Sequence, residues 1–376
     1  MSIKICHVTS VHSRYDVRIF KKECISLNKH GFDVSLLVND TIPSELIDGI
    51  KIVSTGRIDD NKWKRIFIGV PRMRRELIQI DARVYHLHDP ELLTLVRFLK
   101  RKGKIVIFDS HEDYLSTVGV KEWIPKFFRK IIRNFYEYYE RRTIKLCDGA
   151  VVCYHWTAER FSEICRQVQM VLNFPIVNNG WKIKQNDFAS RSLCFAGGIS
   201  RQWCHHEIVK ALGIIGDATY KAAGKVSDDY LNELQNLSGW DQVQFFGKLN
   251  HNEVYSKIYS NSYIGVVLLD YIPQCKFTVG NLSNTKFFEV MYAGLPIICT
   301  DFDLWKEIVD QENCGICVNP HDIEQIVSAI NYLLDNPEIA KQMGENGRNA
   351  VLNKYNWSTE EKKLLALYER VLNQTS

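Results

Sequence analysis

The clearest pattern in the chain is Asn284-Thr285-Lys286-Phe287-Phe288-Glu289-Val290-Met291-Tyr292-Ala293-Gly294-Leu295-Pro296, which runs into the apolar stretch Ile297-Ile298-Cys299-Thr300. It predicts a helix that begins at Asn284 or Thr285, ends at Gly294 and passes directly into a buried strand. A helix N-terminus with a lysine in its first turn attracts phosphate, and Glu289, one turn later, can accept hydrogen bonds from sugar hydroxyls. The segment therefore indicates a nucleoside diphosphate site. A surface helix with two solvated charges is the alternative.

Strands and helices alternate along the whole chain, which predicts an α/β fold. Strands are expected over 3–8, 33–38, 84–87, 104–108, 149–153, 193–196, 219–223, 243–246, 264–269, 296–300 and 315–318. A helix is expected over 16–30, and Pro90 opens another that runs to Leu99. Because the strands are continuously apolar, we expect parallel sheets covered on both faces. The fold class is thus two doubly wound, Rossmann-like domains facing a cleft, with an N-terminal domain over 1–172, a linker over 173–190 and a C-terminal domain over 191–355.

The composition, with 45% hydrophobic and 24% charged residues in 376, predicts a soluble globular protein of more than one domain. No stretch approaches the roughly 20 apolar residues that a membrane span needs, and the N-terminus enters a strand pattern without a signal peptide. Eleven scattered cysteines suit a reducing compartment, so a cytoplasmic location is expected. Cys314 and Cys317 form a single Cys-x-x-Cys with no second pair, so no metal site is expected there.

Charge is divided unevenly, because residues 1–145 carry a net +10 and the remainder a net −6. One basic stretch combines cations with apolar side chains and has no acid: Lys62, Trp63, Lys64, Arg65, Ile66, Phe67, Arg72, Arg74 and Arg75. A second, over 121–145, mixes eight cations and three acids with aromatic and aliphatic residues. Such segments suit an anionic membrane surface, although the apolar residues of the second could instead pack into the domain. No nucleic-acid-binding module is recognisable, so nucleic acid is not an expected partner.

Polar and glycine residues follow the predicted strands, where open parallel sheets bind their ligands. On the N-terminal side these are Thr9, Ser10, His12, Arg14, His88, Asp89, Glu91, Asp109, His111, Glu112 and Asp113. On the C-terminal side they are Gly197, Gly198, Ser200, Arg201, Gly247 and Lys248, followed by the helix with Lys286 and Glu289. Any single histidine of this set could be a capping or core residue. The repetition at successive strand ends instead indicates a site of histidines and carboxylates facing a phosphate-binding site of backbone N–H groups and cations.

In this order and spacing the motifs resemble the retaining glycosyltransferases of family 4, also called group 1, which have the GT-B fold. The opening segments 5–10 and 16–23, together with 86–92 and 109–112, are similar to a bacterial branch that makes surface polysaccharides. The segments 195–200, 284–289 and 293–296 complete a resemblance that runs nearly end to end. It implies transfer of a sugar from a nucleotide-sugar donor to an acceptor hydroxyl, with retention, no bound metal and no cofactor. It also implies that residues 356–376, with a helix over 357–372, return to the N-terminal domain.

The resemblance also implies roles for individual residues. Glu289 matches a glutamate that holds the ribose hydroxyls, Lys286 a donor phosphate contact, and Gly197 with Gly198 the turn that approaches the diphosphate. His111 resembles a histidine that contacts the transferred sugar. The donor side would further include Asn281, Asn284 and Thr285, and the acceptor side His12, Arg14, His88, Asp89, Glu91, Asp109 and Glu112. The acceptor would be a saccharide or a lipid-linked saccharide, which adds a peripheral position at the inner face of the plasma membrane to the expectations.

Three positions depart from the family pattern. Asn281 replaces the first glutamate of a Glu-x7-Glu motif, Trp203-Cys204 replaces a Lys/Arg-Gly pair, and the loop over 11–16 lacks paired glycines. A departing nucleoside diphosphate develops negative charge, and without a metal the candidates to stabilise it are Lys286, Arg201 and the N–H groups at Gly197 and Gly198. No covalent nucleophile is required, because the leaving phosphate can accept the acceptor proton. A GT-B sugar-nucleotide epimerase and a catalytically silent binding protein remain as alternatives.

Overall fold

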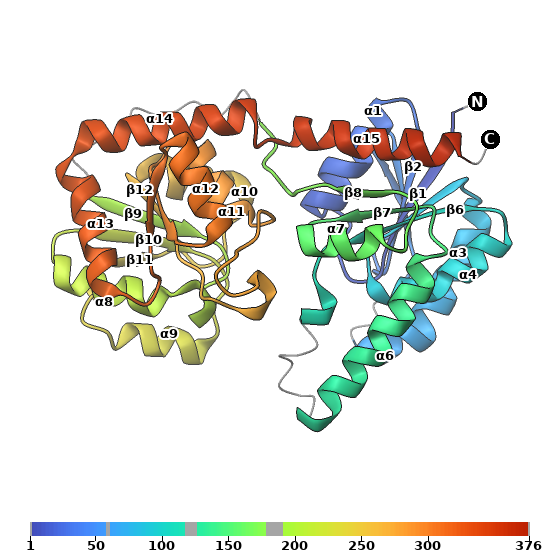
Figure 1. Cartoon of the computed structure of the whole chain (residues 1–376), viewed down its shortest axis with the longest axis horizontal. Coiled ribbons are helices and arrows are strands. Elements are labelled where there is room, and N and C mark those ends of the chain that lie inside the picture. The colour runs from blue at the N-terminus through green and yellow to red at the C-terminus, as the bar shows by residue number, and fades with distance from the viewer. Residues whose placement is uncertain (1, 58–60, 117–125, 178–190, 375–376) are drawn as a thin grey trace. The chain divides into compact units, whose positions relative to one another are not determined.

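The computed structural model describes residues 2–57, 61–116, 126–177 and 191–374, which divide into two compact units. Unit 1 comprises Met1–Asn173 with Trp357–Ser376, and unit 2 comprises Phe174–Asn356. Each unit is a mainly parallel sheet with helices on its faces (Figure 1). This confirms the predicted fold class of two Rossmann-like α/β domains. The linker expected over 173–190 lies outside the described residues from position 178 onward.

The sheet of unit 1 has eight strands in the order β3-β4-β2-β1-β5-β6-β7-β8. Their bounds are β1 Lys4–Thr9, β2 Asp33–Val38, β3 Glu45–Ile47, β4 Ile50–Ser54, β5 Val84–Leu87, β6 Ile105–Ser110, β7 Gly149–Val152 and β8 Val168–Met170. All neighbouring strands are parallel except β3 and β4, which pair antiparallel around Asp48-Gly49. Both turn residues have positive φ, 51° and 77°, as a two-residue hairpin requires. The sequence analysis missed β3, β4 and β8.

The helical segments of unit 1 are η1 Val17–Cys24, α1 Ile25–Lys29, α2 Lys62–Lys64, η2 Arg65–Gly69, α3 Val70–Ile80, η3 Pro90–Leu92, α4 Leu93–Arg101, α6 Lys126–Ile144, α7 His155–Ser162 and α15 Trp357–Asn373. The helix expected over 16–30 is π-helical in η1 and becomes α-helical only in α1. Asp16 caps its N-terminus by accepting from the N–H groups of Arg18 and Ile19, each at 2.9 Å.

The two faces of the first sheet bury separate apolar cores. Cys6, Val8 and Leu87 point to the face that α3 and α4 cover. Ile5 and Val84 point to the other face, where η1 and α15 lie. Because side chains alternate along a strand, polar residues in phase with Ile5 and Val84 are directed into the second core.

Unit 2 has a six-stranded parallel sheet in the order β11-β10-β9-β12-β13-β14. Its strands are β9 Ser192–Ala196, β10 Thr219–Ala223, β11 Val243–Phe245, β12 Ile264–Val267, β13 Ile297–Thr300 and β14 Gly315–Val318. Its helical segments are η4 Arg201–Trp203, α8 His205–Ile215, α9 Asp228–Gln235, η5 Trp240–Gln242, α10 His251–Glu253, η6 Val254–Ile258, η7 Tyr259–Asn261, η8 Pro273–Cys275, α11 Thr285–Tyr292, α12 Asp303–Glu312, α13 Ile323–Asp335 and α14 Pro337–Asn353. The segment 284–300 thus forms the helix α11, followed by the fully buried strand β13. Asn284 caps α11 by accepting from the N–H of Lys286 at 3.1 Å.

Candidate functional site

A pocket of about 420 Å³ lies in unit 2 at the C-terminal ends of β9 and β10 and beside the first turn of α11. Its lining residues are Ala196, Gly197, Gly198, Ala223, Gly224, Lys225, Lys248, Leu249, His251, Val254, Thr285, Lys286 and Glu289. Five predicted donor-side residues, Gly197, Gly198, Thr285, Lys286 and Glu289, are therefore brought together. The pocket is at the strand ends, where a doubly wound sheet binds its ligand.

The glycines at this edge allow the backbone and a lysine to lie unusually close together. A Cβ added to Gly197 would lie 2.1 Å from Cε of Lys286, so a side chain there would displace the lysine. A Cβ on Gly224 would lie 1.5 Å from the carbonyl oxygen of Gly197. The N–H of Gly197 donates to Ala223 at 2.9 Å, and the N–H of Gly224 donates to Gly247 at 2.8 Å. Both glycines are needed because backbone or side-chain atoms fill the space next to them.

Lys286 is held over the pocket by an aromatic ring. Its ammonium lies 4.7 Å from the centre of the Trp203 ring, within the range of a cation–π interaction. Burial lowers the pKa of Lys286, and the nearby Glu289 carboxylate partly offsets that effect. The Tyr259 hydroxyl donates to Glu289 Oε2 at 3.5 Å, which helps to orient the carboxylate. The aromatic residue that replaces the expected cation thus orients Lys286.

Three lysines and one glutamate line this pocket, namely Lys225, Lys248, Lys286 and Glu289. Lys225 and His251 were missed by the sequence analysis. The signal for Lys225 was present, because Gly224-Lys225 follows β10 as Gly247-Lys248 follows β11. The excess of cations, together with the backbone turn at Gly197, suits an anionic ligand such as a diphosphate.

Three other predicted donor-side residues do not line this pocket. Arg201 forms an ion pair with Glu233, and its side chain is 66% exposed. The side-chain amide of Asn281 donates to Cys275 Sγ at 3.2 Å, and the backbone carbonyl of Asn281 accepts from the Trp305 indole N–H at 2.7 Å. Asn284 serves as the helix cap described above. These contacts give Asn281 and Asn284 clear structural roles.

A second group of predicted residues meets at the strand ends of unit 1. His12 and His111 have ring centres 4.9 Å apart, and His12 Nε2 lies 3.5 Å from the Asp89 carboxylate. Asp89 accepts from the Thr9 hydroxyl at 2.8 Å and from the Ser10 N–H at 2.6 Å. The half-buried pair of imidazoles is therefore placed by β1, β5 and β6, whose ends share one edge of the sheet.

The electrostatics of this edge favour a positive charge on His12. Burial lowers the pKa of His12, but the carboxylates of Asp16, Asp89 and Asp109 outweigh it, so the pKa is raised. His111 Nε2 donates to Asp109 Oδ2 at 2.9 Å. Burial alone would raise the pKa of Asp109, but Arg18, at 3.2 Å, holds it well below its usual range. An ionised Asp109 therefore orients His111.

Of four more predicted residues, His88 lies directly behind His111, with its Nδ1 3.0 Å from His111 Nε2, and the other three have different positions. Arg14 is buried and binds Asp40, Glu45 and the carbonyls of Ile42 and Pro43, which makes it a clamp for the loop after β2. Glu91 accepts from Arg65 at 2.8 Å and from Ser10 at 3.1 Å. Glu112 is exposed. Burial lowers the pKa of His88 to about 4, so this fully buried histidine is neutral at physiological pH.

Comparison with known proteins gives two family matches that together span most of the chain. Residues 182–350 match the glycosyl transferases group 1 model, and residues 17–172 match the Glycosyltransferase Family 4 model. The phosphatidyl-myo-inositol mannosyltransferase of Mycobacterium leprae is 20% identical over 318 residues, which cover 81% of this chain and 78% of that protein. Matches to two other curated glycosyltransferases span only 21% and 48% of those proteins' lengths.

Solved structures share the fold at low sequence identity. The sucrose-phosphate synthase of Thermosynechococcus elongatus has a TM-score of 0.75 and 16% identity, over 99% of this chain and 100% of that one. Anabaena HepE, solved in complex with UDP-glucose, has a TM-score of 0.69 and 11% identity, over 98% and 100%. These likenesses agree with the two parallel-sheet units. The family matches and the shared architecture lead to one conclusion: this chain belongs to the group 1, family 4 glycosyltransferases and is a GT-B glycosyltransferase.

Proposed function

We propose that this glycosyltransferase transfers a sugar, with retention and without a metal ion in the reaction, from a nucleoside diphosphate sugar to an acceptor hydroxyl in bacterial polysaccharide or glycolipid assembly. One observation carries the proposal: Lys225, Lys248 and Lys286 surround the glycine turn at the end of β9, with Glu289 one helical turn beyond. Cations and backbone N–H groups suit the diphosphate, and a carboxylate suits a pair of ribose hydroxyls. HepE, which shares the fold, was solved with UDP-glucose.

The reaction needs stabilisation of the negative charge that develops on the departing diphosphate. Lys286 is the first candidate, because burial and the Trp203 ring fix its ammonium at the pocket. Lys225 and Lys248 take the place earlier expected for Arg201, which is paired with Glu233. Preorganised cations act strongly on developing charge because they need no reorganisation during the reaction. An oxygen of the leaving diphosphate would accept the proton of the acceptor hydroxyl. No residue is therefore assigned as a covalent nucleophile.

His111 is proposed to contact the transferred sugar, and His12 and Asp89 to form the acceptor side. Imidazole and carboxylate groups suit hydroxyl recognition because an imidazole can donate and accept hydrogen bonds and an ionised carboxylate accepts them. The ionised Asp109 behind His111 would fix the ring orientation.

An incubation with a panel of nucleotide sugars and a saccharide acceptor tests the proposal. Transfer releases free nucleotide and adds mass to the acceptor, with the anomeric configuration of the donor retained in the product. An inverted product would contradict the retaining mechanism. A changed sugar still attached to its nucleotide would indicate an epimerase, and binding without turnover would indicate a silent protein. Activity that persists undiminished in a strong chelator would support chemistry without a metal, whereas loss restored by Mg²⁺ would overturn that part.

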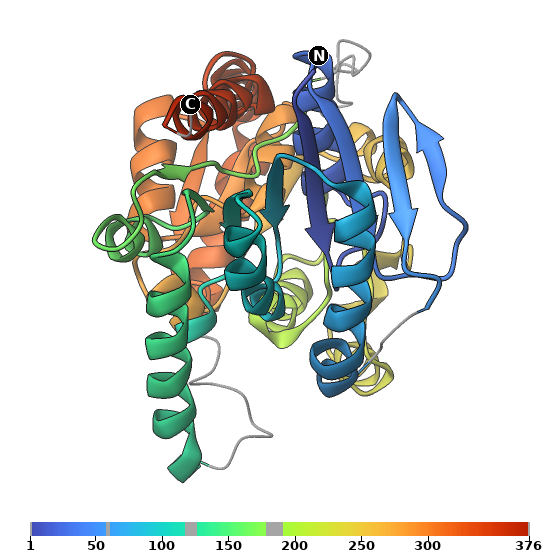
Figure 2. The same cartoon turned by 90° about the vertical axis from the view of Figure 1, so that its right-hand side faces the viewer.

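A lipid-linked acceptor at an anionic membrane surface is the proposed substrate class. Five apolar residues in the N-terminal half of α6 do not pack into the domain, since Phe127, Phe128, Ile131, Ile132 and Phe135 are between 40% and 78% exposed, whereas Ile144 at its C-terminal end is in the core. Figures 1 and 2 show α6 extending past the sheet of unit 1. The same unit carries Trp63 and Phe67, whose rings stack at 6.0 Å and are both exposed. Exposed aromatic faces among cations are typical of helices that lie in a membrane interface.

Two arginines of the first basic stretch interact with other residues of unit 1. Arg65 pairs with Glu91, and Arg74 lies 3.9 Å from the centre of the Phe98 ring, so both have partners within unit 1. Lys64 and Arg75 are exposed. Arg74 and Arg75 also line an apolar groove of about 530 Å³ between α3 and α4, which could take part of a lipid chain. Within the described residues no helix is both long and apolar enough to cross a bilayer.

A further inference from the structure

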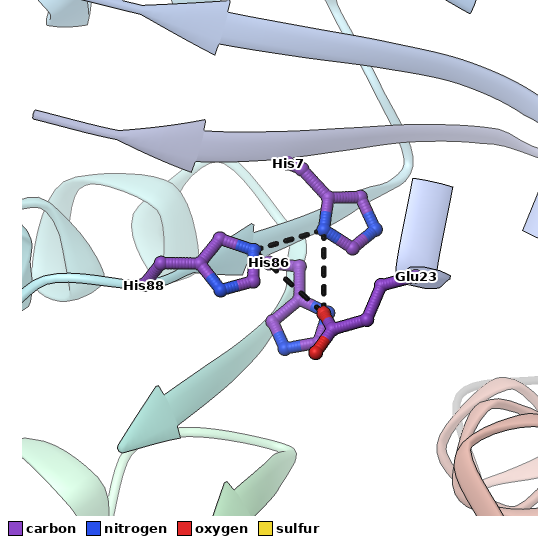
Figure 3. A group of neighbouring side chains, drawn as sticks. All are labelled: His7, Glu23, His86 and His88. Atoms are coloured by element: carbon purple, nitrogen blue, oxygen red, sulfur yellow. Dashed lines mark hydrogen bonds and ion pairs between the residues drawn. The ribbon is translucent and has the colours of Figure 1, made fainter. Parts of the chain in front are cut away.

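Three histidines and one glutamate meet in the core of unit 1, on the face of the sheet that η1 and α15 cover (Figure 3). His7 comes from β1, His86 from β5, His88 from the residue after β5, and Glu23 from η1. All four side chains are fully buried. Each offers one nitrogen or oxygen atom, and these atoms lie within 4.8 Å of one another. The strands bring the histidines together because positions 86 and 88 face the same side of the sheet as position 7.

The separations of three of these atoms match a metal centre. His7 Nδ1 lies 2.9 Å from His88 Nε2 and 3.8 Å from Glu23 Oε2, and His88 Nε2 lies 3.9 Å from Glu23 Oε2. A point equidistant from three atoms with these separations lies about 2.1 Å from each, which is the distance of Zn²⁺ to imidazole nitrogen and carboxylate oxygen. The fourth residue, His86, offers a ligand atom within 4.8 Å of the other three.

Each of the three side chains also has an outer partner on its other polar atom. His88 Nδ1 lies 3.3 Å from Asp109 Oδ2, and His7 Nε2 lies 3.4 Å from the Tyr368 hydroxyl. Glu23 Oε1 lies 3.1 Å from Arg18 Nε. Metal ligands are usually oriented in this way, because a carboxylate, hydroxyl or cation holds the atom that faces away from the ion.

From this geometry we propose that His7, His88 and Glu23, with His86 as the fourth ligand, bind one divalent transition-metal ion, with Zn²⁺ preferred. Imidazole nitrogens with a single carboxylate suit zinc and exclude the all-oxygen sites of Mg²⁺ and Ca²⁺. The ion would join β1, β5 and η1 beneath His111. Because the site is buried, the ion would stabilise unit 1 and would not touch the substrate. It would also hold His88, whose Nδ1 lies 3.0 Å from His111 Nε2, so the proposed sugar contact would rest on a fixed ring.

The competing explanation is a network held by protons alone. A proton between His7 and His88 would account for their 2.9 Å contact. It would leave Glu23 Oε2 and His86 Nε2 without a hydrogen bond from the described residues, although both are buried, whereas Glu23 Oε1 keeps its ion pair with Arg18. Buried polar atoms without such partners are costly, and an ion would satisfy the two that remain, Glu23 Oε2 and His86 Nε2. The ion would also bring the two histidine nitrogens to the same centre without an intervening proton.

The test uses the full chain, purified without a polyhistidine tag, in three forms: wild type, Glu23→Gln and the control His205→Gln. His205 is a matched control because it is a buried histidine in unit 2 whose Nδ1 lies 3.0 Å from the Tyr220 hydroxyl. Elemental analysis should find about one zinc per wild-type chain. Metal-free wild type titrated with Co²⁺ should develop the visible d–d bands of a four-coordinate site, saturating at one equivalent. Glu23→Gln should bind at least tenfold more weakly, and the control should match wild type.

Two results would overturn the proposal: wild type that contains no metal and gives no saturating Co²⁺ bands, or equal binding by Glu23→Gln and wild type. If Glu23→Gln does not fold, the wild type alone decides. Its thermal unfolding midpoint should fall when a strong chelator removes the ion and recover when Zn²⁺ is restored. A midpoint that the chelator and Zn²⁺ both leave unchanged would favour the proton network.

Discussion

At the scale of single residues, the proposed donor site depends on two neighbouring glycines with different surroundings. Gly197 contacts the aliphatic part of Lys286, whereas a Cβ at Gly198 would meet no atom within 4 Å. A side chain at Gly197 would therefore displace Lys286, whereas one at Gly198 would not. Comparing substitutions at the two positions distinguishes this displacement from a general effect of replacing a glycine. From the sequence alone both glycines were predicted to bind phosphate. The sequence could not reveal which of them lies against the Lys286 side chain.

We expect Gly197→Ala to weaken nucleoside diphosphate binding, because the new methyl group would displace Lys286 from the pocket. Loss of one charge-assisted hydrogen bond corresponds to about 1.5–3 kcal/mol, or roughly ten- to over a hundredfold in affinity. Isothermal titration calorimetry of the folded variant measures the change. Gly198→Ala is the matched control and should bind as wild type. Equal affinity in all three proteins would show that Lys286 does not contact the diphosphate.

Replacing Glu289 with glutamine should impair donor binding while leaving stability nearly unchanged. The carboxylate would no longer accept charge-assisted hydrogen bonds from the ribose, so the affinity should fall about tenfold or more. Glu233→Gln provides the comparison, because Glu233 pairs with Arg201 and does not line the pocket. If Glu233→Gln loses affinity and Glu289→Gln does not, the donor site would lie near Arg201 and not at Glu289.

His205 should make unit 2 sensitive to acid. Burial lowers its pKa from 6.5 to about 3, and the Gly198 backbone partly offsets this. Between these two values the unfolded chain binds a proton that the folded chain does not, so stability is full above pH 6.5 and declines as the pH falls. At pH 5 the loss is about 2 kcal/mol. Urea unfolding at pH 7 and pH 5 should show a smaller decline for His205→Gln, and identical declines would contradict the shifted pKa.

At the scale of elements, the sequence predicted the parallel strands well because each is a short apolar run buried on both faces. The segments β2, β5, β10 and β14 have the predicted bounds. The hairpin of β3 and β4 was missed although Asp48-Gly49 is a strong turn signal, because its strands are short and partly exposed. The π-helical form of η1 could not be predicted from periodicity. Its burial of Arg18 and Glu23 depends on partners, such as Asp109, that are distant in sequence.

The exposed face of α6 should determine membrane binding. We expect Phe127→Ser combined with Phe135→Ser to reduce binding to vesicles that contain anionic lipid, since both rings are more than 70% exposed. Wild-type binding should weaken as salt rises, because salt screens the attraction between the flanking cations and the anionic lipids. The Debye length is about 8 Å at physiological ionic strength and becomes shorter as salt is added. The control combines Ile214→Ser and Tyr332→Ser, which remove exposed apolar groups from unit 2. Equal binding by both double variants, or no binding by wild type at low salt, would favour a water-soluble acceptor.

At the scale of the whole molecule, the two basic stretches and the positive half of the charge distribution fall in unit 1, and the diphosphate-like pocket falls in unit 2. The sequence could assign these tendencies because composition is averaged over many residues. Lys225 was missed although the Gly224-Lys225 pair after β10 gave a signal, and the sequence could not distinguish Arg14 from the site residues. That distinction depends on which loops meet at a sheet edge, and the meeting is set by pairs of residues far apart in the chain.

The position of α15 in unit 1 has a consequence for how the chain is made. Residues 174–356 leave the ribosome before 357–373 do, yet Leu364, Leu367 and Tyr368 belong to the first unit's core. At about 5–20 residues per second, unit 1 waits on the order of ten seconds or more with one face of its sheet incomplete. The later-translated unit can close first, so the order of folding reverses the order of synthesis. During that interval the nascent chain presents an uncovered apolar surface, on which a chaperone would act.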